Sequence, residues 1–350
     1  MSWTHLSYAE TGSPDKRVPA EWEPQAATWL QWPGRWERTY EPSFARISEV
    51  ISRYQPLHIL VDSKRTMKRA RRAIAGIGVD PDHPNIAWHT VPNDSAWMRD
   101  NGPVYVIDDG QLRIQNWAFD AWGGAFGEDI PYAADNRVPD QVGEILGLPV
   151  DHIDIVHDRG NLEFNGDDTV LLNWSTIGDP ARNPDYSKAQ AVADLKQHFG
   201  VQRVVMVEGF VEGELTRGHI DGFARFIAPD TVVVAECTAE SQCRPGDGAA
   251  GSLYDAAATV IADAGINVIR DPILGTVDYR DAVFDTNYMN WLVGNGFVIT
   301  VGFGDEALDS AARERIESYF PGRKVYVIEM LESWYHGGGV HCHTNDQPSL

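Results

Sequence analysis

The sequence predicts one α/β domain built from repeated units of short strands and helices. Short runs rich in valine and isoleucine recur along the chain, and segments with apolar residues at helical spacing lie between groups of them. No proline- and serine-rich linker or low-complexity segment separates two halves. We therefore expect a single domain over residues 1–350, with residues 1–20 as a loosely ordered lead-in.

The individual elements follow from local pattern. Trp29–Trp32 is expected to be a strand that ends at a Pro-Gly turn, and Phe44–Tyr54 a helix with apolar residues at helical spacing. Lys64–Ile77 is expected to be a basic amphipathic helix with a solvated face. The remaining expected strands are His58–Val61, Val104–Ile107, Ile153–Val156, Thr169–Asn173, Val204–Val207, Thr231–Ala235, Asn267–Arg270, Phe297–Val301 and Val325–Ile328. The remaining expected helices are Gln141–Leu148, Ser187–Phe199, Leu253–Ala264 and Glu306–Phe320.

Composition indicates a folded, acidic protein. Apolar residues make up 43% of the 350 positions, and Trp, Tyr and Phe occur twelve times each, which disfavours disorder. The formal charge of −22 argues against nucleic acid or an anionic membrane as a partner, because phosphate groups require lysine and arginine. An acidic field attracts instead a cationic small molecule or a basic peptide. A homo-oligomer is compatible with the sequence, which does not fix the oligomeric state.

The three cysteines set the expectation for the compartment. Because the number of cysteines is small and odd, we expect no disulfide framework and a reducing environment. Cys237 and Cys243 are expected to have a structural role and no catalytic one. The N-terminal residues do not resemble a leader peptide, and no apolar run reaches membrane-spanning length, so we expect a cytoplasmic protein. No strand is followed by the glycine fingerprint of a nucleotide site and no Walker sequence occurs, so no nucleotide cofactor is expected.

The run Gly337–His343 near the C-terminus is the most informative stretch for chemistry. Three consecutive glycines allow positive φ and close approach to a ligand, and one valine later Cys342 lies between two histidines. A thiol becomes nucleophilic as the thiolate, whose formation neighbouring cationic or donor groups favour. Alone, Cys342 is more simply a buried, inert cysteine. The whole run favours a functional site.

Two acidic stretches each allow a bland and a functional interpretation. Asp100 precedes an Asn-Gly-Pro turn, which it can simply cap. Asp158 follows the expected strand Ile153–Val156, at the kind of strand end where α/β proteins build sites. It can equally form a surface ion pair with Arg159, which would contribute little.

His219 and Asp221 form a third group of candidate functional residues. In an extended segment these two residues point to the same face, and a histidine beside a carboxylate can be a general acid/base or a ligand pair. A satisfied core histidine is the simpler alternative. The glycines on both sides indicate close backbone approach and favour function.

Together these groups suit covalent attack on an electrophilic carbon in a cationic substrate. Carboxylates would destabilise the oxyanion of a cysteine protease, but they pair bidentately with a guanidinium. A metal-dependent hydrolase that uses His219, Asp221, His341 and His343 is an alternative from another class, although these four residues would have to converge tetrahedrally from distant segments.

Several motifs along the chain resemble the agmatine deiminase and bacterial-type peptidylarginine deiminase family of guanidino-modifying enzymes. The resemblance runs through Pro19–Gln25, Trp97–Pro103, Phe119–Gly124, Gly160–Gly166, Gly218–Asp221, Asn287–Tyr288 and Gly337–Cys342. It implies a pentein fold, a five-bladed pseudo-symmetric α/β propeller of repeated short-strand and helix units. It also implies deimination of a small guanidino substrate, with agmatine as the default, without a cofactor or metal.

Carried over by position, the resemblance makes Cys342 the nucleophile and His219 the general acid/base. Asp100 and Asp221 match carboxylates that hold the guanidinium, and Asp158 lies where a further one sits. Pocket-lining or positioning roles are implied for Asn287, Trp122, Trp97 and Gly339.

The sequence departs from the family pattern at three positions. Asp158 is one methylene shorter than the usual Glu, Arg159 replaces what is commonly a second glycine, and His343 follows the nucleophile where an apolar residue is more frequent. Arg159 beside the pocket is expected either to repel the ammonium of agmatine or to accept a substrate carboxylate. Peptide-linked arginine and other guanidino compounds are therefore alternative substrates.

Overall fold

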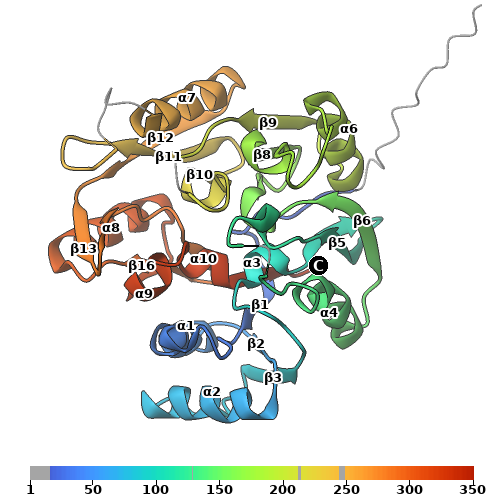
Figure 1. The fold of residues 1–350 in the computed structure, drawn as a ribbon, viewed down its shortest axis with the longest axis vertical. Coiled ribbons are helices and arrows are strands. Elements are labelled where there is room, and N and C mark those ends of the chain that lie inside the picture. The colour runs from blue at the N-terminus through green and yellow to red at the C-terminus, as the bar shows by residue number, and fades with distance from the viewer. Residues whose placement is uncertain (1–15, 128, 212–213, 244–248) are drawn as a thin grey trace, which may run out of the picture.

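Five small sheets are arranged around a common centre in the computed structural model, which describes residues 16–127, 129–211, 214–243 and 249–350 (Figure 1). The strand orders of the five sheets are β18-β1-β2-β3, β4-β5-β6, β7-β8-β9, β10-β11-β12 and β15-β16-β17, and β13 and β14 form a separate hairpin. The strands are β1 (Gln25–Gln31), β2 (Leu57–Val61), β3 (Ile86–Thr90), β4 (Val104–Asp108), β5 (Gln111–Ala118), β6 (Val150–Val156), β7 (Glu163–Phe164), β8 (Thr169–Asn173), β9 (Arg203–Val207), β10 (Ala224–Ala228), β11 (Thr231–Cys237), β12 (Asn267–Ile273), β13 (Thr276–Tyr279), β14 (Ala282–Asp285), β15 (Leu292–Gly294), β16 (Phe297–Gly302), β17 (Lys324–Glu329) and β18 (Thr344–Pro348). The expected five-bladed α/β propeller is thereby confirmed.

Each blade repeats one connection pattern. An antiparallel pair of strands is followed by a helix, and the helix returns the chain to a third strand that runs parallel to the second. Parallel neighbours cannot be joined by a tight turn, so each blade needs a helical crossover. The crossover helices are α1 (Glu41–Ser52), α4 (Val138–Leu146), α6 (Lys188–Phe199), α7 (Ala249–Asp263) and α8 (Glu306–Tyr319), and they lie around the outside (Figure 1). The first blade has a second crossover helix, α2 (Lys64–Gly76), which leads to β3.

The ring is closed by the two ends of the described chain. β18 pairs antiparallel with β1, with Thr344 opposite Leu30 and Asn345 opposite Trp29. A segment near the C-terminus therefore completes the first blade. The closure also fixes the position of the short helix α10 (Val340–His343), which runs directly into β18.

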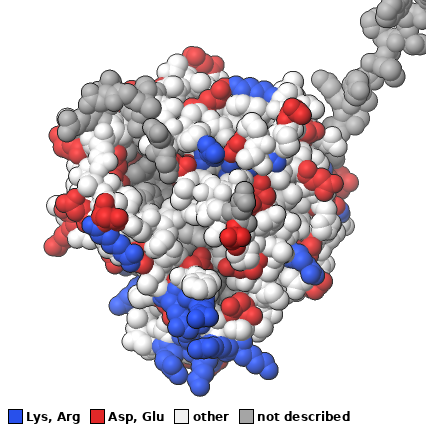
Figure 2. Space-filling view, in the orientation of Figure 1, with Lys and Arg blue, Asp and Glu red and all other residues white. Residues whose placement is uncertain are grey.

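Local sequence signals set the helix boundaries. Ser187 caps α6 and forms a capping box with Gln190, and Asp305 accepts from two backbone N–H groups at the start of α8. Gly147 ends α4 with a φ of 67°, a left-handed conformation that glycine adopts without a steric penalty. Figure 2 shows basic side chains gathered at the edge of the molecule where α2 lies, whereas acidic side chains and a few basic ones are scattered over the rest of this face, as expected for a solvated basic helix face.

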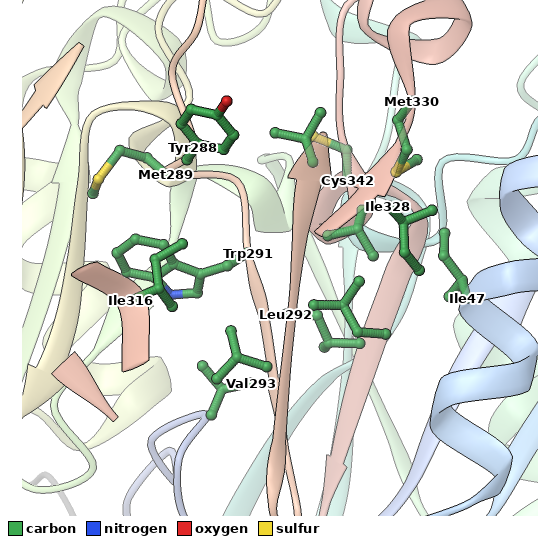
Figure 3. Packing of buried hydrophobic residues seen from close by; sticks show 14 of the residues in the cluster. Ile47, Tyr288, Met289, Trp291, Leu292, Val293, Ile316, Ile328, Met330 and Cys342 are labelled. Carbon is green, nitrogen blue, oxygen red and sulfur yellow. The ribbon is translucent and has the colours of Figure 1, made fainter. Parts of the chain in front are cut away.

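The largest buried apolar cluster extends through the first, fourth and fifth blades and reaches the thiol. Leu292 of β15, Ile328 of β17 and Ile47 of α1 belong to it, and so do Met330 and Cys342 (Figure 3). The sulfur of Cys342 thus lies at the border between apolar packing and the polar centre of the propeller.

Residues 1–15 of the expected loose lead-in over residues 1–20 lie outside the described part of the chain. In the remainder, Arg17 exchanges two backbone hydrogen bonds with Ile107, and Val18 and Ala20 are buried. One expectation was wrong. Cys237 and Cys243 form a disulfide, although the cysteine count had predicted none. Within the described residues no helix is long and apolar enough to span a membrane.

Candidate active site

The first strand of four blades is preceded by a short helix or turn that carries, or directly follows, a predicted site residue. These leading turns are α3 (Met98–Asn101) with Asp100, η4 (Arg159–Asn161) after Asp158, η5 (Ile220–Gly222) with Asp221, and α10 with Cys342. Successive leading turns contact one another: α10 contacts α3, α3 contacts η4, and η4 contacts η5. In the fifth blade Asn287 precedes β15 in the same way. Pseudo-symmetry therefore brings residues far apart in sequence to one centre.

Cys342 lies in α10, and its side chain is buried. Its Sγ accepts a hydrogen bond from Nδ2 of Asn290 at 3.1 Å and lies 3.6 Å from Oδ2 of Asp221. Burial raises the pKa of the Cys342 thiol well above its usual value, and the carboxylates of Asp221 and Asp100 add to the effect. The free site therefore holds a neutral thiol at neutral pH.

Asp221 is held by two donors. Its Oδ2 accepts from Nδ2 of Asn290 at 3.0 Å and lies 2.7 Å from Nδ1 of His341. Burial acts to raise the pKa of Asp221, but His341, His219 and Arg225 outweigh it and hold the pKa below the usual range. Asp221 is thus an anion next to the thiol.

His219 lies between two carboxylates. Its Nε2 is 3.0 Å from Oδ2 of Asp158, and its Nδ1 is 3.5 Å from Oδ1 of Asp100. Burial acts to lower the pKa of His219, but Asp100, Asp158 and Asp221 outweigh it and raise the pKa to about 9. The imidazole is therefore protonated at neutral pH. His219 precedes η5 and is not part of the extended segment that the sequence suggested.

Asp158 lies behind His219, and the protein already neutralises it. Its Oδ2 accepts from Nη2 of Arg182 at 2.8 Å and from Nε at 3.1 Å, and both side chains are fully buried. Burial acts to raise the pKa of Asp158, but Arg182 and His219 lower it well below the usual range. This geometry favours a role in orienting His219 over direct contact with a guanidinium.

Arg159 also differs from expectation. It does not pair with Asp158 at the surface; its Nη2 donates to Oδ1 of Asp346 at 2.8 Å, and the side chain is buried. Arg99 donates to the same oxygen at 2.7 Å. The expected effect of Arg159 on the charge of the pocket is therefore corrected, because its cation is already paired inside the protein.

Asp100 is fixed by two donors, one from the segment after β5 and one from η4. Its Oδ2 accepts from the indole N–H of Trp122 at 2.8 Å, and its Oδ1 accepts from the backbone N–H of Gly160 at 3.1 Å. A Cβ at position 160 would lie 2.5 Å from Oδ1 of Asp100 and 2.6 Å from Nδ1 of His219, so only glycine fits there. Burial raises the pKa of Asp100 to about 6, and His219 opposes the effect.

Two adjoining cavities open from this centre. The inner one, of about 160 Å³, is lined by Cys342, His219, Asp221 and Asn287 among others. A small space of about 10 Å³ next to Asp100 shares Cys342 with the inner cavity and Trp122 with an outer cavity of about 610 Å³. The residues that line the outer cavity include several aromatic side chains and the acids Glu37, Asp94, Asp129 and Asp135, and no lysine or arginine among the described residues.

The remaining predicted residues form the walls. Trp97 stacks on His343 with ring centroids 4.2 Å apart and lines the outer cavity. Asn287 donates to the carbonyl of Gly222 at 2.9 Å, so its amide holds the wall of the inner cavity. Gly339 packs against Asn290, whose Oδ1 would lie 2.8 Å from an added Cβ.

The glycines at 337–339 matter chiefly because an added Cβ would lie too close to neighbouring atoms. Gly337 alone among the three has positive φ, 115°. At Gly338 a Cβ would lie 2.8 Å from the sulfur of Cys342 and 2.6 Å from the ring of Trp97. Gly338, which we had not singled out, therefore sets the space around the sulfur.

The arrangement does not favour the metal alternative. Within the described residues no group of three histidine, cysteine or acidic side chains is arranged to hold a metal ion. His343 turns away from the others, with Nδ1 at 2.7 Å from the carbonyl oxygen of Ala96 and Nε2 next to Oγ of Ser333. The four histidine and aspartate side chains of that hypothesis do not converge.

Comparison with known proteins agrees with this geometry. Residues 17–348 match the family model of the Porphyromonas-type peptidyl-arginine deiminases. The chain belongs to this family. A putative agmatine deiminase of Enterococcus faecalis is 30% identical over 95% of both chains, and an agmatine deiminase of Stutzerimonas stutzeri is 29% identical over 95% of both.

The solved structures extend this agreement to the fold. The agmatine deiminase of Enterococcus faecalis superposes with a TM-score of 0.83 at 28% identity and covers 97% of this chain and 99% of its own. As a member of the peptidyl-arginine deiminase family, the chain is a hydrolase that acts on carbon–nitrogen bonds of amidine-type groups.

Several residues of this deiminase site had no signal in the sequence that identified their role. Asn290, Arg182 and Gly338 are single polar or small residues whose partners are far away in sequence. Glu21 and His341 lay in stretches that carried the resemblance, and His341 had been considered as a neighbour of the thiol and as a metal ligand, but not as a partner of Asp221. Their contacts depend on how the blades meet, which local sequence does not encode.

Proposed function

We propose that this deiminase hydrolyses a small guanidino substrate, with agmatine giving N-carbamoylputrescine and ammonia. The observation that carries the proposal is the convergence of Cys342, His219 and Asp221 on one buried cavity with Asp100 beside them. A thiol surrounded by buried acids is poorly suited to an anionic transition state, but it suits a planar cation.

The electrostatics favour a guanidinium in this cavity. At a separation of about 4 Å and an effective dielectric of about 20, each carboxylate contributes roughly 4 kcal/mol of gross attraction to a cation. Asp100 and Asp221 together are enough to offset much of the desolvation of the substrate.

The same charge activates the thiol. The acids that raise the pKa of Cys342 in the free protein are neutralised when a guanidinium binds between them. Substrate binding therefore lowers the pKa of the thiol, so that the thiolate forms when its target is already in place. This coupling protects the free enzyme from unproductive reactions of an exposed thiolate.

The chemical steps begin with the thiolate, whose proton has passed to solvent. The Cys342 thiolate forms a bond to the guanidinium carbon, and protonated His219 donates its proton to one terminal nitrogen, which leaves as ammonia. The product of this half-reaction is an amidino-cysteine. A water molecule then loses one proton to His219 and attacks the same carbon, and the C–S bond breaks. The second water proton passes to solvent, so a neutral ureido product leaves the regenerated thiolate and protonated His219.

The outer cavity indicates the chemistry of the rest of the substrate. Its aromatic walls and four acids favour a cationic tail, and the absence of lysine and arginine from its described lining disfavours a carboxylate. Agmatine carries such an amine, whereas free arginine carries a carboxylate. Because the cavity of about 610 Å³ is larger than a four-carbon tail requires, peptide-linked arginine is the second candidate.

Ammonia release tests the proposal. The wild type is assayed with agmatine, free arginine and an arginyl peptide, and Cys342→Ala serves as the inactive control. We expect turnover of agmatine, about 100-fold lower kcat/KM for arginine because of the unpaired carboxylate, and an amidino adduct on Cys342 by mass spectrometry after an acid quench. Ammonia release by Cys342→Ala at the wild-type rate would refute the nucleophile.

A further inference from the structure

The histidine next to the nucleophile connects the active site to the N-terminal stretch of the domain. His341 is buried, and both of its ring nitrogens face carboxylates: Nδ1 lies 2.7 Å from Oδ2 of Asp221, and Nε2 lies 2.8 Å from Oε2 of Glu21. Glu21 itself accepts from Nη2 of Arg225 at 3.0 Å and from the backbone N–H of Val293 at 2.7 Å. The proposed chemistry assigns no role to Glu21 or to His341.

The two contacts require two hydrogens. A neutral imidazole has one N–H, and a bare nitrogen and a carboxylate oxygen repel each other at hydrogen-bond distance. The group formed by Asp221, His341 and Glu21 therefore holds one proton more than a neutral imidazole and two carboxylates. One hydrogen points from Nδ1 to Asp221, and the other lies between Nε2 and Glu21.

The surroundings decide which of the two hydrogens is held more weakly. The charged groups around His341 are Asp221, Glu21, Arg225, Arg99 and Asp346, with the thiol of Cys342 on the next residue. Burial, Arg225 and Arg99 lower the pKa of His341 well below its usual value, although the hydrogen bond to Asp221 opposes them, so the extra proton is weakly held. The hydrogen between Nε2 and Glu21 is consequently the one lost as the pH rises.

We propose that Glu21 and His341 form a positioning relay: Glu21 keeps a hydrogen on Nδ1 of His341, and this hydrogen fixes Asp221 beside the sulfur. Because His341 and Asn290 both bind Oδ2 of Asp221, the other oxygen is left for the substrate guanidinium. When the second proton leaves, one hydrogen is shared between two carboxylates and Asp221 loses its fixed orientation. The inference rests on the proposed deimination, in which Asp221 holds the cation.

Two substitutions of His341 separate the two contacts. The side-chain amide nitrogen of asparagine takes the place of Nδ1, and that of glutamine takes the place of Nε2. His341→Asn is therefore expected to keep kcat/KM within about tenfold of wild type, since one hydrogen bond is weakened. His341→Gln, which still reaches Glu21 but not Asp221, is expected to lose about 100-fold through misplacement of the acid.

Glu21→Gln tests the proton itself. The glutamine amide can donate to Nε2, so the hydrogen stays on Nδ1 without a titrating proton, and the fall in kcat/KM that accompanies loss of this proton as the pH rises is expected to disappear. Glu163→Gln is the matched control, because Glu163 also accepts from Arg225, at 3.0 Å, without touching His341. That variant is expected to keep this fall at the same pH as in the wild type.

A purely structural role for the relay predicts a different pattern. Equal losses in His341→Asn and His341→Gln, or the same pH profile in Glu21→Gln and wild type, would overturn the inference, provided that thermal unfolding shows each variant folded. The rate at which iodoacetamide alkylates Cys342, measured against pH, gives the same comparison without turnover. If the wild type deiminates nothing, the proposed function fails, while the alkylation profiles still decide on the relay.

Discussion

Replacing Arg182 with glutamine tests how the protein keeps an acid buried behind the imidazole of His219. Nε and Nη2 of Arg182 donate to Oδ2 of Asp158, Nη2 also donates to the carbonyl of Thr216 at 3.1 Å, and neither charged side chain is exposed to solvent. Glutamine removes the cation and leaves a buried carboxylate whose remaining ionic partner is His219.

The expected cost follows from that burial. Removing one partner of a buried ion pair typically costs 3–5 kcal/mol, because the other charge is left without compensation. A change of 1 kcal/mol shifts the Tm of a chain of this size by roughly 2 °C. Arg182→Gln is therefore expected to lower the Tm by about 6–10 °C at neutral pH.

The pH dependence has a definite sign. The folded-state pKa of Asp158 is depressed, so its contribution to stability is fully present above the unfolded value of about 3.9 and is lost as the pH falls towards the folded value. Arg182→Gln removes most of this contribution. The difference in Tm between wild type and variant is thus expected to be largest at neutral pH and to shrink below about pH 4.

Thermal unfolding followed by circular dichroism measures these effects. Arg113→Gln is the control, since it breaks an ion pair with Asp151 whose side chains are 31% and 45% exposed, and such pairs contribute up to about 1 kcal/mol. The double variant Asp158→Asn with Arg182→Gln is expected to be more stable than Arg182→Gln alone, because no buried charge is left unpaired. A Tm within 1 °C or so of wild type for Arg182→Gln, or a difference independent of pH, would refute the reasoning.

Further predictions concern the sulfur and its surroundings. Because burial and the neighbouring acids raise the pKa of Cys342, alkylation by iodoacetamide is expected to be slow at pH 7 and to keep accelerating beyond pH 9; a plateau reached below pH 8 would contradict this. Gly338→Ala is expected to lower kcat/KM about 100-fold by displacing the sulfur or Trp97. Its control is Gly76→Ala, at the end of α2, where an added Cβ meets nothing within 4 Å and activity should be unchanged. The agmatine, arginine and peptide comparison described above is expected to rank agmatine first, and equal rates for arginine would remove the argument from the acidic outer cavity.

The sequence pattern was sufficient to predict a strand where consecutive side chains are all buried. Thr169–Asn173 was predicted as a strand and forms β8 with the same bounds, because all its side chains are buried and the apolar run is uninterrupted. β5 was missed because arginine, glutamine and asparagine interrupt its pattern. β18 has the sequence TNDQP, which has no strand signal; its pairing with β1 comes from closure of the ring.

The candidate site shows the same limit. The motifs predicted which side chains meet, but they did not show that Asp158 would be paired with Arg182, since the two residues belong to different segments with no local signal of contact. The placement of His219 before a tight turn instead of in a strand follows from the neighbouring glycines, whose effect depends on tertiary contacts. The candidate site residues could be predicted from residue type and motif, whereas their ionic partners depend on how the blades assemble.

The position of Cys342 directly before the last strand has a consequence for biogenesis. On the ribosome, the three acids and the imidazole of the centre are synthesised long before the sulfur that completes them. The sulfur reaches its place only when β18 docks against β1, so the enzyme gains activity in the same event that joins its two ends. A chain that ends at His343 would hold Cys342, His219 and the three acids, and would be inert because it lacks the strand that places the sulfur.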